Sequence, residues 1–146
     1  YDEKLNIKKI LILRNYCKKR GNKIFLANDV KLAIKLGLNG AYLPSFNKRF
    51  NHLSFKYKKK FLILGSAHSQ KEIEIKKKQG VNIVFLSSLF KKNKNYLGIN
   101  RFRLITNSND LEFIALGGLN NQNVKKLKII NVTGYAGISI FKKKGP

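Results

Sequence analysis

The sequence has no methionine and no tryptophan, and it has a single cysteine, Cys17. One cysteine cannot form a disulfide within the chain, which excludes a disulfide-stabilised scaffold and fits a reducing, cytoplasmic location. No hydrophobic run is long enough to cross a bilayer and no signal-peptide pattern stands at the start, so we expect no membrane association. Because the chain opens at Tyr1 rather than at a methionine, we expect a fragment that lacks its beginning.

Acidic residues are also scarce: the chain has 7 Asp and Glu against 31 Lys and Arg, a formal net charge of +24. This charge favours an anionic partner, either nucleic acid or a phosphorylated molecule. However, the abundant residues lysine, asparagine, isoleucine and phenylalanine have codons made mostly of A and T, so an AT-rich genome would give the same composition. The lysines are also scattered over many expected helix faces. We therefore expect attraction of phosphorylated metabolites rather than specific nucleic-acid binding.

Short apolar runs alternate with amphipathic segments at about 20–25 residues per unit, which is typical of βα barrels and doubly wound sheets. The expected strands are 23–27, 41–43, 61–64, 81–86, 111–116 and 135–141. The expected helices are 2–20, 30–36, 70–78, 99–106 and 121–130, with a basic, weakly helical piece at 53–60. We predict a single α/β domain over residues 1–146.

The apolar run 111–116 ends in Gly117 and Gly118, and a helical pattern follows. A buried parallel strand that leads into a helix has this pattern. Two adjacent glycines leave main-chain N–H groups accessible near a helix N-terminus, and such groups bind phosphate. The next strand carries Gly134 and Gly137, so the two turns together predict a phosphate site of the kind found after strands seven and eight of (β/α)8 barrels.

Polar residues follow two other expected strands. Asp29 either caps the helix 30–36 or, together with Asn28, forms a polar pair at the catalytic rim, with Asp29 as a Mg²⁺ ligand. Ser66 and His68 either face a substrate or serve only the turn before helix 70–78. Ser69 and Glu72 have the spacing of a capping box at the start of that helix.

Two basic segments complete the candidates. The loop 87–95 is long for an α/β protein, and its lysines either close over a phosphate or are simply solvated. His52, in the polar segment 46–52, is expected to be exposed to solvent.

Several of these stretches, in this order, resemble the thiamine-phosphate synthase family, which includes thiazole tautomerases. The stretches are 26–37, Gly40–Leu43, 64–72, 115–120 and 134–139. The resemblance implies a (β/α)8 TIM barrel of which about strands three to eight are present, the first two lying upstream of Tyr1. It also implies a transferase of thiamine biosynthesis that joins an aminopyrimidine methyl diphosphate to a thiazole phosphate and releases pyrophosphate.

The resemblance further implies residue roles. Asn28 would contact pyrophosphate, Asp29 would hold Mg²⁺, and Lys94 would be the loop lysine that contacts pyrophosphate. Ser66 would line the pocket. The remaining phosphate ligands would be the main-chain groups of Gly117, Gly118, Ile138 and Ser139.

This sequence departs from the family pattern at several points. Asn47 stands where the family usually has a second metal-binding aspartate, which should weaken Mg²⁺ binding. Lys92 and Lys94 replace threonines, and Tyr42 stands where a histidine is common. The family's cation-bearing Gln-x-Arg-x-Lys strand would precede Tyr1.

Two alternatives stay open. One is a thiazole tautomerase of the same family, which would need no metal and in which His68 would move protons. The other is a non-catalytic barrel that binds phosphate or nucleic acid. The loop lysines come without aromatic stacking platforms, which disfavours the nucleic-acid version.

Overall fold

The computed structural model describes residues 6–138, 140 and 141. Six strands form one sheet in the order of the sequence, β1-β2-β3-β4-β5-β6, and every neighbouring pair is parallel. The strands are β1 Phe25–Ala27, β2 Gly40–Leu43, β3 Leu62–Ala67, β4 Ile83–Leu86, β5 Glu112–Leu116 and β6 Gly134–Ala136. The α-helices are α1 Ile7–Lys19, α2 Val30–Lys35, α3 Gln70–Lys78 and α4 Gly98–Asn107. Two 3₁₀ helices are η1 Asn51–Ser54 and η2 Val124–Ile129.

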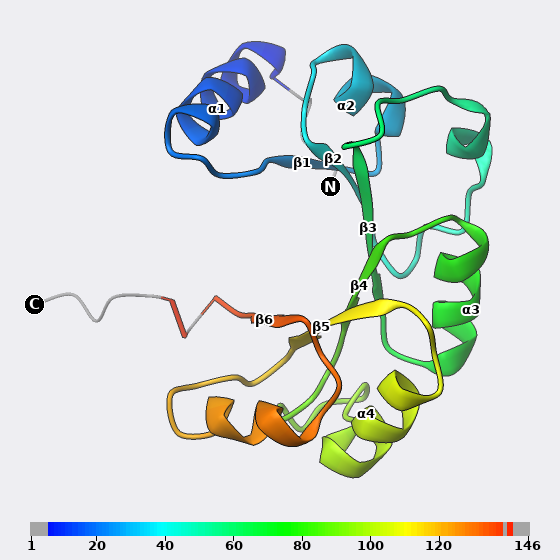
Figure 1. The fold of residues 1–146 in the computed structure, drawn as a ribbon, viewed down its shortest axis with the longest axis vertical. Helices are drawn as coiled ribbons and strands as arrows, with labels where there is room; N and C mark the ends of the chain where they lie inside the picture. The colour runs from blue at the N-terminus through cyan, green and yellow to red at the C-terminus, as the bar shows by residue number, and fades with distance from the viewer. Residues whose placement is uncertain (1–5, 139, 142–146) are drawn as a thin grey trace, which may run out of the picture.

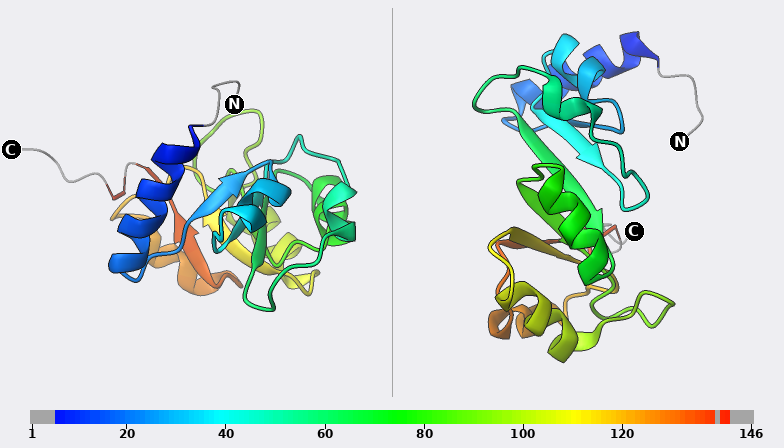
Figure 2. Two further views of the ribbon diagram at one scale, coloured as in Figure 1. Left: turned by 90° about the horizontal axis from the view of Figure 1, so that it is seen from above. Right: turned by 90° about the vertical axis from the view of Figure 1, so that its right-hand side faces the viewer.

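The sheet is curved, with α2, α3 and α4 on its convex side (Figure 1). In the right-hand view of Figure 2, α3 lies in front of the sheet, and this helix packs on β3. A sheet of consecutive parallel strands covered by helices on one side is the arrangement of a (β/α) barrel, and six strands make part of one. This architecture agrees with the predicted fold class.

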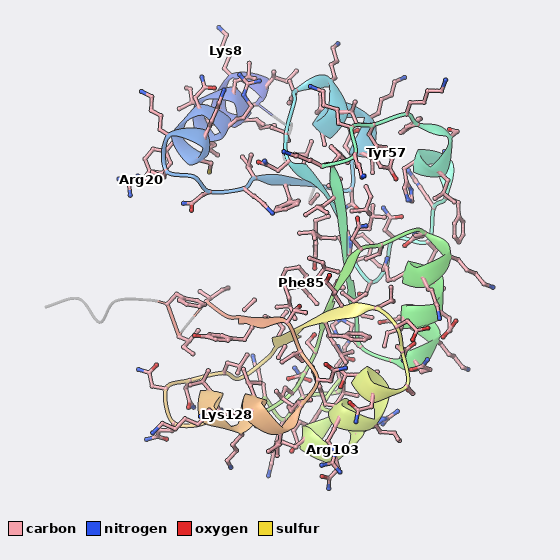
Figure 3. All side chains as sticks on the ribbon, viewed as in Figure 1. Lys8, Arg20, Tyr57, Phe85, Arg103 and Lys128 are labelled. Atoms are coloured by element: carbon pink, nitrogen blue, oxygen red, sulfur yellow. The ribbon has the colours of Figure 1, made fainter. Side chains whose placement is uncertain are left out.

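The strand register separates the two faces of the sheet. The face that packs against the helices is buried and apolar, as expected where a parallel sheet is covered. Its members in the core include Leu26, Ala41, Leu43, Ile63, Val84, Phe113 and Ala115. On the concave face, the rings of Tyr42 and Phe85 meet edge to face, 5.9 Å between centroids. Figure 3 shows Phe85 on this concave side, whereas Lys8 and Arg103 point outward from opposite ends of the molecule.

Helix α3 has the predicted bounds because its local signals agree. Ser69 Oγ accepts from the Glu72 N–H at the N-terminus, three lysines occupy the last turn, and Gly80, with φ of 66°, follows the helix. The predicted capping-box spacing is therefore confirmed at Ser69, although the Glu72 carboxylate accepts from the N–H of His68, one residue earlier than in the standard box.

Several boundaries were predicted wrongly. Residues 55–60 are not helical, and only the 3₁₀ turn η1 forms nearby. The segment expected as helix 121–130 is the 3₁₀ helix η2, because Asn120 and Asn123 side chains bond main-chain groups ahead of it and compete with an α-helical start. The last strand ends at Ala136 rather than at Phe141. The first helix is confirmed over Ile7–Lys19, while residues 2–5 lie outside the described residues.

Within the described residues, no helix combines the length and the apolar character needed to cross a bilayer.

Candidate functional site

The carboxyl ends of all six strands meet at one edge of the sheet, and nearly every predicted site residue lies there. Asn28 follows β1, Ser66 is the second-last residue of β3, His68 directly follows that strand, and the glycine pair follows β5. Ile138 follows β6, with 81% of its surface exposed. Ser139 lies outside the described residues. Since parallel strands place their ends side by side, the shared edge was predictable, whereas the contacts within it were not.

The turn after β5 lies beside the turn after β6, because Leu116 pairs with Ala136 in the parallel ladder. Gly117 and Gly118 both have positive φ, 102° and 76°. Their carbonyls are hydrogen-bonded: Gly117 O accepts from the N–H groups of Phe90 and Lys91, and Gly118 O accepts from Asn123 Nδ2. Among the described residues, the N–H groups of the two glycines have no hydrogen-bond acceptor. Two such consecutive amides can bind an anion.

The glycine pair also supports the loop after β4, a role that the sequence did not reveal. A Cβ on Gly117 would lie 2.5 Å from Ser88 Oγ, and a Cβ on Gly118 would lie 2.5 Å from Lys91 N. Ser88 in turn closes the loop by accepting from Leu97 N and donating to Asn95 O. The loop is therefore ordered by main-chain contacts, and Lys94 lies exposed at its tip.

One of the roles predicted for the pair Asn28–Asp29, the helix cap, is confirmed, and the metal and pyrophosphate roles stay predictions. Asp29 Oδ1 accepts from Leu32 N at 2.8 Å, so Asp29 caps α2 as predicted. Asn28 has φ of 64°, an unusual conformation for a residue with a side chain, and its Oδ1 accepts from Asn47 Nδ2 at 2.9 Å. The position at which the family has a second aspartate is thus bonded to Asn28.

A cleft of about 590 Å³ opens beside this pair. Its polar lining includes Asn28, Asp29 and Asn47 together with the cationic side chains of Lys31 and Arg49, and its apolar lining includes Leu26, Leu43 and Phe55. The cleft therefore places positive charge and hydrogen-bonding oxygens around one space, which suits a polyanion accompanied by a divalent cation.

The region after β3 orients His68. Its Nδ1 lies 3.1 Å from the carbonyl oxygen and 2.9 Å from the hydroxyl of Ser87. A carbonyl oxygen can only accept, so this geometry favours a proton on Nδ1 and leaves Nε2 as the nitrogen able to accept one. Ser66 Oγ accepts from Ser45 N at 3.0 Å and is buried at the same sheet edge.

His52 is buried, with 5% of its surface exposed, and its Nε2 lies 2.8 Å from Gln79 O. The prediction of a solvent-exposed histidine is therefore wrong. Its neighbour in this cluster, Lys76, is fully buried and was not singled out from the sequence, because it stands in a run of three lysines that reads as a solvated helix end.

Burial lowers the pKa of Lys76 to about 8, partly opposed by the carboxylate of Glu72. Below about pH 8 the native and unfolded states both carry the proton, so the cost of burying the charge is fully present there. Between that pKa and the unfolded value of 10.5, the unfolded state binds more protons, so stability rises with pH.

We therefore expect the free energy of unfolding of the wild type to rise relative to that of Lys76→Met as the pH increases from about 7.5 to about 10. The expected relative gain is at most about 3 kcal/mol. Urea unfolding of both proteins at several pH values measures it. Because the other lysines titrate alike in both proteins, parallel pH profiles would contradict this expectation.

Comparisons with known proteins identify the family and the fold of this chain. The profile of a family described as thiamine monophosphate synthase matches residues 1–141. The thiamine-phosphate synthase of Methanococcus vannielii is 32% identical over 83 residues, which cover 53% of this chain and 40% of that protein. A thiamine-phosphate synthase of Prochlorococcus marinus is 29% identical over 132 residues, 87% of this chain and 38% of that protein. The chain thus spans about two fifths of the length of these curated relatives.

A solved structure, the thiamine phosphate pyrophosphorylase from Pyrococcus furiosus, superposes with a TM-score of 0.75 at 19% sequence identity. The superposition covers 94% of this chain and 69% of that one. At this identity the likeness concerns the fold, and it confirms the predicted α/β barrel class.

Proposed function

The chain belongs to the thiamine monophosphate synthase family, and from this premise we propose that it acts in thiamine biosynthesis as a thiamine-phosphate synthase-like transferase. The proposed reaction joins an aminopyrimidine methyl diphosphate to a thiazole phosphate and releases pyrophosphate. Two features near the carboxyl ends of the strands support the proposal, and we assign an anion to each. One is the glycine pair beside the turn after β6, and the other is the cleft beside Asn28 and Asp29.

The roles of the residues follow from the charges that the reaction moves. The bond between the methylene carbon and the diphosphate oxygen breaks, and the ring nitrogen of the thiazole attacks the resulting carbon cation. Negative charge grows on the leaving pyrophosphate, so hydrogen-bond donors and cations fixed around it stabilise the transition state. We assign this task to Asn28, Lys31 and Arg49, which line the cleft. We add Lys94 of the loop after β4, because the family resemblance implies this role.

The thiazole phosphate is assigned to the N–H groups of Gly117, Gly118 and Ile138, together with Ser139. Main-chain amides hold a phosphate in a fixed position and add no titrating group. We assign Ser66 to the pocket lining, and we assign His68 Nε2 to a substrate proton.

Mg²⁺ fits the donors in the cleft only in part. Within the described residues no group of three or more His, Cys, Asp or Glu gathers. Asp29 offers one carboxylate, and Asn28 and Asn47 offer amide oxygens. Since Mg²⁺ commonly uses one or two carboxylates together with substrate phosphates, this set suits an ion that arrives with the diphosphate. When bound there, Mg²⁺ would neutralise charge on the leaving pyrophosphate.

Cys17 is unpaired, which fits our proposal of a cytoplasmic protein.

A second candidate is a thiazole tautomerase, and the geometry of His68 supports it. A histidine with Nδ1 bonded to Ser87 and Nε2 able to accept a proton suits proton transfer on a thiazole carboxylate phosphate. Asn47, bonded to Asn28 in place of an acidic metal ligand, is compatible with this metal-free reaction.

The purified full chain should form thiamine phosphate from the two substrates with Mg²⁺ and lose this activity in excess EDTA. Chromatography of the product and measurement of released pyrophosphate follow the reaction. Tautomer conversion in EDTA without pyrophosphate release would favour the second candidate. Binding of substrates without either reaction would leave a non-catalytic phosphate-binding protein.

A further inference from the structure

The side chain of Lys76 ends in a buried set of main-chain acceptors. Its Nζ donates to Pro44 O at 2.7 Å, to Asn47 O at 2.8 Å and to Gln79 Oε1 at 2.9 Å. Three acceptors match the three N–H bonds of an ammonium group. Burying a lysine with no carboxylate in hydrogen-bond contact costs free energy of folding. A buried lysine whose three N–H bonds are all satisfied therefore indicates that the protein needs these hydrogen bonds in place.

Gln79, one turn further along, contacts the same segment. Its Nε2 donates to Asn47 O at 3.1 Å and to Arg49 O at 2.8 Å, and its main-chain oxygen contacts His52. Lys76 and Gln79 therefore hold residues 44–49, which we call the Asn47 loop, against the end of α3.

The strand beneath leaves room for this arrangement. A Cβ on Gly65 would lie 3.0 Å from Lys76 Cδ, so the glycine lets the lysine stem pass across β3. A side chain that reaches from α3 across β3 to the segment after β2 ties three parts of the barrel together.

The loop so held presents Asn47 to the cleft. Asn47 Nδ2 donates to Asn28 Oδ1 at 2.9 Å, and both residues line the cleft next to Asp29. Asn28 has a left-handed backbone conformation, so an external bond helps to keep its side chain in place.

We propose that Lys76 and Gln79 are positioning residues that act through the Asn47 loop to fix Asn28 at the diphosphate end of the site. The link to catalysis rests on the proposed function, whereas the holding of the loop does not.

The test compares Lys76→Met with Lys77→Met, which removes the same charge from an exposed neighbour. Lys76→Met should raise the KM for the diphosphate substrate roughly tenfold, while the KM for the thiazole phosphate stays unchanged. Lys77→Met should leave both constants unchanged. Amide hydrogen exchange at Asn47, whose N–H bonds Pro44 O, should become faster only in Lys76→Met.

Asn47→Ala controls for a folding defect in Lys76→Met. It keeps the bonds from Lys76 and Gln79, because both residues bond only the main-chain oxygen of Asn47. This variant should show the same selective rise in KM, and the double variant Lys76→Met/Asn47→Ala should add little to it. An equal rise in both KM values, or additive effects, would overturn the proposal.

If the wild type forms no thiamine phosphate, the proposed function fails, and binding of inorganic pyrophosphate replaces KM in the comparison. Unchanged pyrophosphate affinity and unchanged loop exchange in Lys76→Met would then refute the positioning role by itself.

Discussion

Gly118→Ala should destabilise the protein by about 2–4 kcal/mol and weaken the binding of the thiazole phosphate at least tenfold. The new Cβ would lie 2.5 Å from Lys91 N and 2.9 Å from the carbonyl carbon of Phe90, and both are main-chain atoms that cannot rotate away. The φ of 76° adds the strain of a left-handed alanine. Relief of the clash must move either the turn or the loop after β4, and both border the proposed phosphate site.

Gly21→Ala is the matched control. Gly21 has φ of 68°, and no atom lies within 4 Å of its Cβ position. This variant measures the conformational cost alone, about 1 kcal/mol, without a clash. Urea unfolding and calorimetric binding of the thiazole phosphate compare the two variants. Equal losses of stability, with phosphate affinity intact in both, would show that Gly118 contacts neither the loop nor the ligand as described.

Asp29→Asn should lower the Mg²⁺-dependent rate by about 100-fold or more while changing the free energy of unfolding by less than about 1 kcal/mol. An asparagine at this position still offers an oxygen to Leu32 N, so the cap of α2 survives while the proposed anionic metal ligand is lost. The experiment thereby separates the observed capping role of Asp29 from its proposed role as a metal ligand.

Asp29→Ala serves as its comparison, since it removes both roles and should cost about 1 kcal/mol in addition. Rates measured across a Mg²⁺ titration, together with urea unfolding, give both quantities. A rate for Asp29→Asn that saturates with Mg²⁺ as in the wild type would mean that the aspartate only caps the helix.

The parts of the fold that the sequence predicted well depend on local rules. The bounds of α3 follow from Ser69, Glu72 and Gly80, and the six strands follow from short apolar runs at regular intervals. The common edge of Asn28, His68 and Gly117 follows from parallel strand order alone.

The failures concern contacts between segments distant in the chain. His52 and Lys76 look exposed in the sequence, because histidine and lysine are usually found at the surface, yet both are buried through bonds to Gln79 or to residues about 30 positions away. The sequence also does not predict the contacts between the pair Gly117–Gly118 and residues 88–91, because no periodic pattern of residues indicates them. The prediction of a helix over 121–130 was wrong because the side chains of Asn120 and Asn123 bond main-chain groups there.

The central claim is that the turns after β5 and β6 together bind the phosphate of the thiazole substrate. The most direct test is a titration of the isotope-labelled full chain with thiazole phosphate, followed by amide chemical shifts in NMR spectra. We expect the largest shifts at Gly117, Gly118 and Ile138, with inorganic phosphate shifting the same amides more weakly. Shifts confined to surface lysines, or absent from the glycine pair at saturating ligand, would contradict the claim.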